Sequence, residues 1–270
     1  RIRSRGLGDV YKRQVALPGA VLPGDFAIKQ SVIRGVESSG MLCSEKELGL
    51  SEESSGIMIL PEDAPVGEKF SLYKGLDDIL FELKVTPNRA DCLSHFGLAR
   101  ELSNLLSLDL RYPENELQVE AGLSTKECIS LEVKDAENCP RYAGRFIEGV
   151  KVAPSPAWLR TRVEAIGLNS INNVVDVTNY VMMEMGQPLH AFDQREIKGN
   201  SILVDKAQAG EKFTSLDGTE YTLDGSELVI RDQERPVALA GVVGGKNSGV
   251  QDDTTNSVSY THLRAHETEY

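Results

Sequence analysis

The sequence feature that most limits the fold is a run of apolar residues at helical spacing that ends abruptly. These residues recur every three or four positions on one face: Ile171, Val174, Val175, Thr178, Val181, Met182 and Met185. The stripe predicts an amphipathic helix that begins near Asn169 or Ser170. Gly186 and Pro188 end it, because glycine favours helix termini and proline cannot continue a helix.

A second helix is predicted before this one, and strands are predicted after it. Ser155 is the expected N-cap and Pro156 the first helical residue. From residue 202 onward, short apolar runs alternate with the turn pairs Asp217-Gly218 and Asp224-Gly225, as in β-hairpins. This half of the chain is therefore expected to be α+β.

The first part of the chain has a different pattern. Residues 15–70 combine short apolar pieces with Pro-Gly turn signals, as small β-barrels do. Apolar and polar residues alternate through 79–85, which predicts a half-buried strand. Asp91 is the expected N-cap of a helix with an apolar stripe over 93–106. The sequence therefore predicts a multi-domain α+β protein.

The two ends of the chain lack such patterns. Residues 1–14 are basic and aperiodic, residues 257–270 are equally patternless, and both resemble translated sequencing-adapter read-through. We therefore expect both to be non-native tails. The formal charge is −12, and the ends carry +4 and −1, which leaves −15 for residues 15–256.

A body this acidic is not expected to attract nucleic acid as a whole. Contact with RNA would depend on local basic side chains, namely Arg141, Arg145, Lys151, Arg160 and Arg162. From the pattern alone, a solvated surface is the favoured interpretation of these residues.

Composition also bears on location and cofactors. The apolar runs are far shorter than the roughly 20 residues that cross a bilayer, and no segment is organised as a secretory signal peptide. The cysteines form no CxxC pair and lie near no histidine at metal-ligand spacing: Cys43, Cys92, Cys128 and Cys139. We expect a cytoplasmic protein with reduced thiols, no membrane association and no bound metal.

The glycine-rich stretch AGVVGGKNSG at 240–249 partly matches a phosphate-binding loop. A Walker A loop requires glycine at its first position and Ser or Thr after the lysine. Those positions hold Ala240 and Asn247, and SGVQDD is a poor helix start. We reject the nucleotide-loop interpretation and expect the glycines to allow close backbone approach to a ligand or another chain.

The polar side of the 169–185 helix and its exit form another candidate site. Thr178 and Asn179 point about 100° apart around the helix. His190 follows beyond the GQP break, and a break of this kind can point an imidazole into a cleft. The alternative is a local turn or cap with Asp193, which the raw pattern favours.

Four long stretches occur in one order and carry a family resemblance: SVIRGVESSGMLCSEKELGL, VTPNRADCLSHFGLAREL, VVDVTNYVMMEMGQPLHAFD and ALAGVVGGKNSGVQDDTTN. They are similar to the β subunits of bacterial phenylalanyl-tRNA synthetases from about residue 15 to 256. The resemblance implies a partial OB-fold tRNA-binding module at 15–76. It also implies a strand-helix joining module at 77–117 and a partial α+β editing module at 118–256.

The resemblance also implies a function. Such a synthetase attaches phenylalanine to tRNA(Phe) with ATP and Mg²⁺, on a separate α subunit of a heterotetramer. The β subunit binds tRNA and hydrolyses misacylated Tyr-tRNA(Phe). Thr178, Asn179, His190 and Gly244 match editing-pocket positions of the family. His190 is expected to order the ester or the attacking water, or to transfer a proton. Gly244 would leave room for the substrate, and Thr178 and Asn179 would shape the pocket floor.

The resemblance stops at Asn256, so the isolated chain is expected to neither aminoacylate nor edit efficiently, and to bind neither ATP nor Mg²⁺. One alternative is a stand-alone RNA-binding or interaction module without enzymatic activity. Another, a nucleotide hydrolase built on 240–249, is disfavoured by Ala240 and Asn247.

Overall fold

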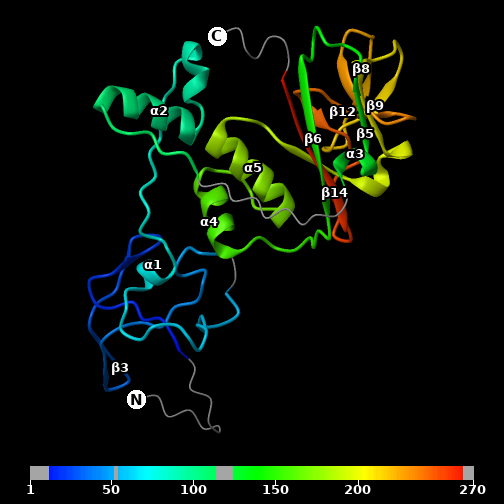
Figure 1. Ribbon diagram of the computed structural model, residues 1–270. Helices are drawn as coiled ribbons and strands as arrows, with labels where there is room; N and C mark the ends of the chain where they lie inside the picture. The colour runs from blue at the N-terminus through cyan, green and yellow to red at the C-terminus, as the bar shows by residue number, and fades with distance from the viewer. Residues whose placement is uncertain (1–11, 52–53, 114–123, 264–270) are drawn as a thin grey trace. The chain divides into compact units, whose positions relative to one another are not determined.

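The computed structural model describes residues 12–51, 54–113 and 124–263 (Figure 1). The chain divides into two compact units, Arg1–Ile79 and Leu80–Tyr270. Helices and small sheets occur in both, so the fold is of the mixed α+β class that the sequence predicts. None of the helices in these described ranges is long and apolar enough to cross a membrane.

The first unit contains two short antiparallel hairpins and one short helix. Its elements are β1 (Val21–Leu22), β2 (Phe26–Ala27), β3 (Ser31–Ile33), β4 (Val36–Ser38) and α1 (Phe70–Tyr73). β1 pairs with β2, and β3 pairs with β4. The predicted turn signal Pro23-Gly24 lies between β1 and β2, with Gly24 in the left-handed region at φ +78°.

A small apolar cluster joins the segments that flank these hairpins. Ala16, Ile28 and Cys43 are buried in it. Ala16 also pairs with Met41 through two backbone hydrogen bonds of 2.8 and 2.9 Å. Lys12, which the sequence analysis assigns to the N-terminal tail, forms a β-bridge with Leu60, whose N donates to Lys12 O at 3.0 Å. Residues 1–11 of that tail lie outside the described part of the chain.

The strand predicted at 79–85 is wrong. These residues form neither helix nor strand, and Ile79, Leu80 and Phe81 are 72%, 68% and 76% exposed. Alternation specifies which side chains share a face, but a strand also needs a hydrogen-bonded neighbour. Among the described residues, 79–85 has no such neighbour.

The helix predicted after Asp91 begins three residues later than expected. Pro87–Cys92 forms the 3₁₀ helix η1, and α2 spans His95–Leu106. The cap is Ser94, whose Oγ accepts a hydrogen bond from Gly97 N at 3.0 Å. Asp91 does not cap because its carboxylate pairs with Arg89 at 3.0 Å. The boundary proposed after this helix falls on residues 114–123, outside the described ranges.

The two helices predicted at 155–186 are present and pack together. α4 spans Ala157–Ala165, with Pro156 at the N-cap position. α5 spans Asn173–Met185, so the predicted start near Asn169 or Ser170 is wrong by three to four residues. The helix begins later because Asn172 caps it, with Oδ1 accepting from Val174 N and Val175 N at 3.1 and 2.9 Å. The predicted stop at Gly186 is confirmed, since this residue is left-handed at φ +81°.

A buried carboxylate connects these two helices. Asp176 of α5 is fully buried and accepts hydrogen bonds from Ser155 Oγ and Ser170 Oγ at 2.5 Å each, and from Ile171 N at 2.9 Å. Ser155 therefore bonds Asp176 and does not cap α4, which corrects the predicted N-cap. Burial opposes ionisation, but these hydrogen bonds hold the pKa of Asp176 below its ordinary 3.8.

The second unit also contains two larger sheets (Figure 1). The first has the order β13-β12-β11-β8-β5 and is antiparallel except where β5 meets β8. Its strands are β5 (Ser130–Val133), β8 (Ser201–Lys206), β11 (Leu228–Arg231), β12 (Pro236–Leu239) and β13 (Val243–Gly244). The second sheet is antiparallel with the order β6-β14-β7. Its strands are β6 (Arg141–Glu148), β7 (His190–Asp193) and β14 (Asn256–Leu263).

Shorter elements connect these sheets. They are α3 (Thr125–Cys128), the 3₁₀ helices η2 (Gln194–Glu196) and η3 (Lys198–Asn200), and the hairpin strands β9 (Lys212–Thr214) and β10 (Glu220–Thr222). The predicted turn Asp217-Gly218 joins β9 to β10, and Gly218 has a φ of +86°. Strands therefore occur throughout 201–244, as the sequence predicts.

Both sheets contribute to one apolar core, which also contains Ile129 and Cys139. Its fully buried strand residues are Phe192, Ile202, Val204, Ile230, Val237 and Val258. These come from β7, β8, β11, β12 and β14, so the core fixes the second sheet against the first.

Part of the segment that the sequence analysis assigns to a C-terminal non-native tail is a strand in the structure. Residues 257–263 continue β14, which lies between β6 and β7. Val258 and Tyr260 are two positions apart, and both are buried in the core, as alternate residues of a strand are. The pairing does not bear on whether this segment is native, so that part stays a prediction. Residues 264–270 lie outside the described part of the chain.

We predict that Asp176→Ala destabilises the second unit by about 1–3 kcal/mol, because three donors lose their buried acceptor. Urea unfolding followed by the fluorescence of Trp158, the chain's single tryptophan, measures this change. Since the folded pKa lies below 3.8, the contribution is complete above about that pH and is lost as pH falls through the folded value. Glu164→Ala, which breaks only the exposed pair with Arg160, should change stability by less than about 0.5 kcal/mol. Equal effects of the two changes would contradict the role given to Asp176.

Candidate functional site

His190 is the first residue of β7, and its imidazole is packed against aromatic rings. The ring centroids of Phe192 and Tyr260 lie 5.0 and 5.6 Å away, both in edge-to-face geometry. Nε2 is shielded from solvent and has no hydrogen-bond partner among the described residues. Burial lowers the pKa of His190 to about 4, so the imidazole is neutral at neutral pH.

Gly244 of β13 lies directly against this imidazole. A Cβ at position 244 would be 2.6 Å from His190 Cε1 and 2.7 Å from Nε2. No side chain fits in this space unless the imidazole moves, so a glycine is required here for steric reasons. The structure thus brings together two of the four site residues predicted from the sequence.

The other two predicted residues lie on α5. Thr178 donates a hydrogen bond from Oγ1 to Val175 O of its own helix at 2.7 Å, and Asn179 is half-buried. Although α5 packs against β7, no hydrogen bond among the described residues joins Thr178 or Asn179 to His190. Their assignment to the pocket floor stays a prediction.

Leu216 is a neighbour of this site that the sequence analysis missed. A Cβ at position 244 would be 3.1 Å from Leu216 Cδ1, and Leu216 N donates to Gly244 O at 3.0 Å. The side chain is 50% exposed. In the sequence, only its position just before the Asp217-Gly218 turn marks this residue. A turn position does not tell which way the side chain points.

The glycine-rich segment serves close packing within the chain. Gly245 N donates to Val237 O at 2.7 Å, and a Cβ at position 245 would lie 2.7 Å from that oxygen. Ser248 Oγ donates to the same carbonyl at 3.1 Å. Turns and not a helix follow β13, which agrees with rejection of the Walker A interpretation.

Asp193 forms the local cap that the sequence analysis gave as the alternative for this region. Its carboxylate accepts from Arg195 N at 2.9 Å at the start of η2. His190 takes no part in that cap, so its imidazole remains available for another role.

The described residues contain no group of three or more His, Cys, Asp or Glu side chains that could hold a metal ion. All four cysteines are free thiols. Of the five basic residues singled out in the sequence, four lie on two elements, and Lys151 lies in the segment between them. Arg141 and Arg145 are exposed on β6, while on α4 Arg160 pairs with Glu164 and Arg162 lies over the Trp158 ring.

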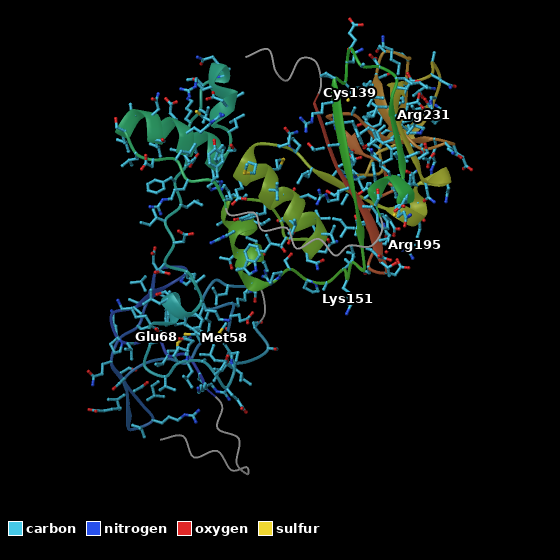
Figure 2. All side chains as sticks on the ribbon, in the orientation of Figure 1. Met58, Glu68, Cys139, Lys151, Arg195 and Arg231 are labelled. Carbon is cyan, nitrogen blue, oxygen red and sulfur yellow. The ribbon has the colours of Figure 1, made fainter. Side chains whose placement is uncertain are left out.

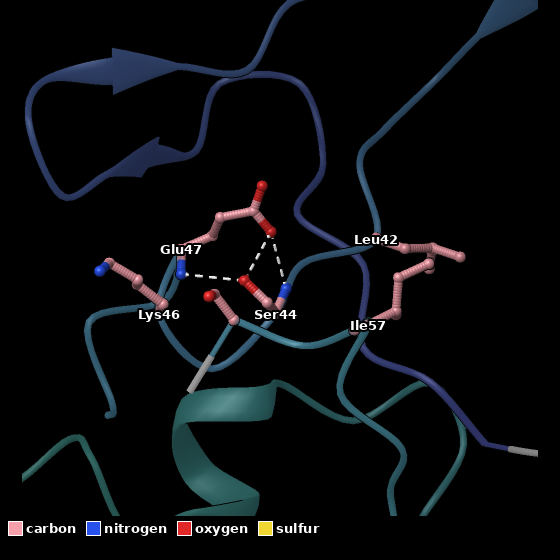
Figure 3. Close-up of a pocket in the computed structure, with 7 residues that line it drawn as sticks. Leu42, Ser44, Lys46, Glu47 and Ile57 are labelled. Atoms are coloured by element: carbon pink, nitrogen blue, oxygen red, sulfur yellow. Dashed lines mark hydrogen bonds between the residues drawn. The ribbon is translucent and has the colours of Figure 1, made fainter. Parts of the chain in front are cut away.

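A hollow of about 360 Å³ lies in the first unit (Figure 3). Two of its polar residues are paired with each other, since Glu47 accepts from Ser44 N and Ser44 Oγ at 2.7 and 2.9 Å. The hydrogen bond from Ser44 N is the larger cause of a lowered Glu47 pKa, and the bond from Ser44 Oγ is the second. The arrangement is that of a stabilised turn, and it gives no sign of a ligand.

We predict that Gly244→Ala displaces the imidazole of His190 and destabilises the unit by about 1–3 kcal/mol through overpacking. The displacement is measured as a change in the His190 ring resonances by NMR, and the destabilisation by urea unfolding. Gly144→Ala is the matched control, because a Cβ there would meet only Leu131 Cδ1 at an ordinary 3.4 Å. Unchanged His190 resonances in Gly244→Ala would contradict the close contact.

Two protein-family models match this chain. The "Putative tRNA binding domain" matches residues 6–69, and the B3/4 domain matches residues 138–261. The second match contains all four predicted site residues.

Curated relatives match most of this chain but only part of their own length. The phenylalanine--tRNA ligase β subunit of Bdellovibrio bacteriovorus is 67% identical over 241 residues, covering 89% of this chain and 30% of that protein. The same subunit of Geobacter sulfurreducens is 56% identical over 245 residues, covering 91% of this chain and 30% of that protein. An N-terminal fragment of the phenylalanyl-tRNA synthetase β subunit of Pyrococcus horikoshii has a TM-score of 0.39 at 18% identity, over 65% of this chain and 52% of that one, too weak a likeness to define the fold. This chain, which spans about 30% of the length of the curated relatives it matches, belongs to the phenylalanine--tRNA ligase β-subunit family.

Proposed function

We propose that this chain is part of the β subunit of a phenylalanine--tRNA ligase, in which it contributes to tRNA binding and forms one wall of a hydrolytic editing site. The observation that carries the proposal is the 67% identity over 241 residues to a subunit of that name. The contact between His190 and Gly244, inside the region matched by the B3/4 domain, supports the location of the site.

The reason for an editing site is chemical. A pocket that accepts phenylalanine rejects tyrosine, which adds one hydroxyl, by only about 10²-fold. A second pocket that recognises the wrong product and hydrolyses its ester supplies the remaining discrimination. The proposed substrate here is therefore Tyr-tRNA(Phe).

His190 would act on the ester by hydrogen bonding. The shielded Nε2 of its neutral imidazole has no partner among the described residues, so it can bond the attacking water or the substrate. A pKa of about 4 makes the ring a weak base at neutral pH, which favours ordering of the water over complete proton removal. Gly244 would leave space beside the ring, and Thr178 and Asn179 would shape the pocket floor.

Access to this nitrogen requires a small movement. Nε2 is shielded in the present structure, and the backbone of Gly244 closes one side. Leu216 lies at the same place but is half exposed, so it is the side chain that can move at low cost. We propose that substrate enters past Leu216.

The proposed modules follow the family matches. Residues 15–76 would be part of an OB-fold tRNA-binding module, which the match at 6–69 supports. Residues 77–117 would join it to the editing module at 118–256. With −15 on the body, tRNA would be bound by local basic groups, and the exposed Arg141 and Arg145 are candidates.

Aminoacylation itself would belong to an α subunit, with which the complete β subunit would assemble as a heterotetramer in the cytoplasm. ATP and Mg²⁺ would act there, and this chain would bind neither. The chain would then depend on the remainder of the longer protein for editing activity.

We predict that His190→Ala in a complete β subunit, assembled with its α subunit, lowers hydrolysis of Tyr-tRNA(Phe) by about 100-fold or more. Aminoacylation with phenylalanine should be unchanged. His95→Ala is the matched control, because His95 is exposed on α2 and bonds only Met183 O. Wild-type hydrolysis by His190→Ala would refute the role of this residue.

The isolated 270-residue chain should not deacylate Tyr-tRNA(Phe) in the same assay. Measurable hydrolysis by the isolated chain would contradict the proposal that the rest of the pocket lies in other parts of the protein.

A further inference from the structure

Arg195, labelled in Figure 2, lies outside the proposed site but contacts both segments that carry it. On the β7 side, its Nη2 is 2.7 Å from Asp193 Oδ2 and its Nε is 3.1 Å from Asp193 Oδ1. On the loop side, Nη2 and Nη1 are 2.7 and 3.0 Å from the carboxylate of Asp253. One guanidinium therefore bridges the end of β7 and the loop that follows β13.

The acceptor on the β7 side is a buried group. Asp193 is 1% exposed, and it accepts from Arg195 N as well as from the guanidinium. It also accepts from Thr254 Oγ1 at 2.5 Å. Thr254 is itself buried, and its Oγ1 accepts a hydrogen bond from Gln251 N at 2.9 Å. The loop is thus bonded to β7 through Asp193 from two directions.

Backbone contacts link the same two segments nearer to the site. Asp193 N donates to Ser248 O at 3.0 Å, and Phe192 forms a bridge with Gly249. His190 lies at the start of β7, and Gly244 immediately precedes the loop. The pairing of β13 with β12 places Gly244, and the bonds between this loop and β7 act together with that pairing to fix the separation of His190 from Gly244.

That separation has little tolerance. A Cβ at position 244 would lie 2.6 Å from the imidazole, so small shifts of the loop change the surroundings of Nε2. Displacements of about 1 Å in a catalytic arrangement can cost about 10²-fold in rate.

We infer that Arg195 is a positioning residue that, through Asp193 and Asp253, holds His190 against Gly244 for ester hydrolysis. This inference rests on the proposed function. Arginine suits the position because its planar fork bonds two carboxylates at once, whereas a lysine ammonium cannot match both geometries.

A purely stabilising role would give a different result. The Arg195–Asp253 half of the bridge is solvent-accessible, with side chains 48% and 75% exposed. Pairs this exposed contribute little to global stability. Loss of Asp253 should therefore leave the fold intact and act on the geometry of the site.

The test uses the complete α and β assembly with Tyr-tRNA(Phe). Arg195→Ala is expected to lower kcat for hydrolysis by about 10- to 100-fold with KM little changed. Asp253→Ala should lower kcat in the same direction at an unchanged melting temperature. Arg195→Lys should recover only a small part of the activity, and Asp253→Glu, which keeps the carboxylate, most of it. Arg160→Ala is the control, since it removes an exposed arginine ion pair on α4.

The outcomes separate the inference from the proposed function. Absence of hydrolysis by the wild-type assembly would overturn the proposed function. Wild-type hydrolysis together with wild-type kcat in both Arg195→Ala and Asp253→Ala would overturn the inference alone. An equal loss in Arg160→Ala, or full recovery by Arg195→Lys, would also overturn it.

Discussion

The apolar core between the two sheets of the second unit is the constraint on which the candidate site depends. Phe192, Val237 and Val258 are fully buried in it, and burial of each such side chain stabilises the fold by about 1.5–3 kcal/mol. Alternate residues of a strand share a face, so the inward position of Phe192 also directs His190 inward. Because β12 is fixed in the same core, its partner strand β13 brings Gly244 to the imidazole.

Buried titratable groups in this unit differ in whether hydrogen bonds compensate for their burial. Asp176 and Asp193 each accept several hydrogen bonds, and their pKa values stay below the ordinary range although burial opposes this. They are therefore charged and act as structural links. His190 has no such partner at Nε2, so burial acts on it without compensation and keeps it neutral. This difference is what distinguishes a candidate reacting group from a structural one.

The features that could be predicted from sequence are those that local chemistry determines. The stripe of α5 and its stop at Gly186 need only helical spacing and a left-handed terminus, and the 201–244 strands follow from their turns. Of two features that failed, one depends on a distant partner and the other on a competing local contact. Residues 79–85 alternate but have no described neighbouring strand, and Asp91 pairs with Arg89 and does not cap α2. The contact of His190 with Gly244 was suggested by family resemblance and not by spacing. The Arg195–Asp253 bridge joins residues 58 positions apart, for which the sequence carries no local signal.

The central claim is that His190 is a neutral, enclosed imidazole whose Nε2 has no partner. An NMR pH titration of its ring in the 270-residue chain, with His190→Gln to assign the resonance, tests this directly. The structure predicts a pKa of about 4. Between pH 6.5 and that value the unfolded chain takes up a proton that the folded chain does not, so stability should fall as pH falls. A pKa near 6.5, with stability unaffected over this interval, would contradict the claim.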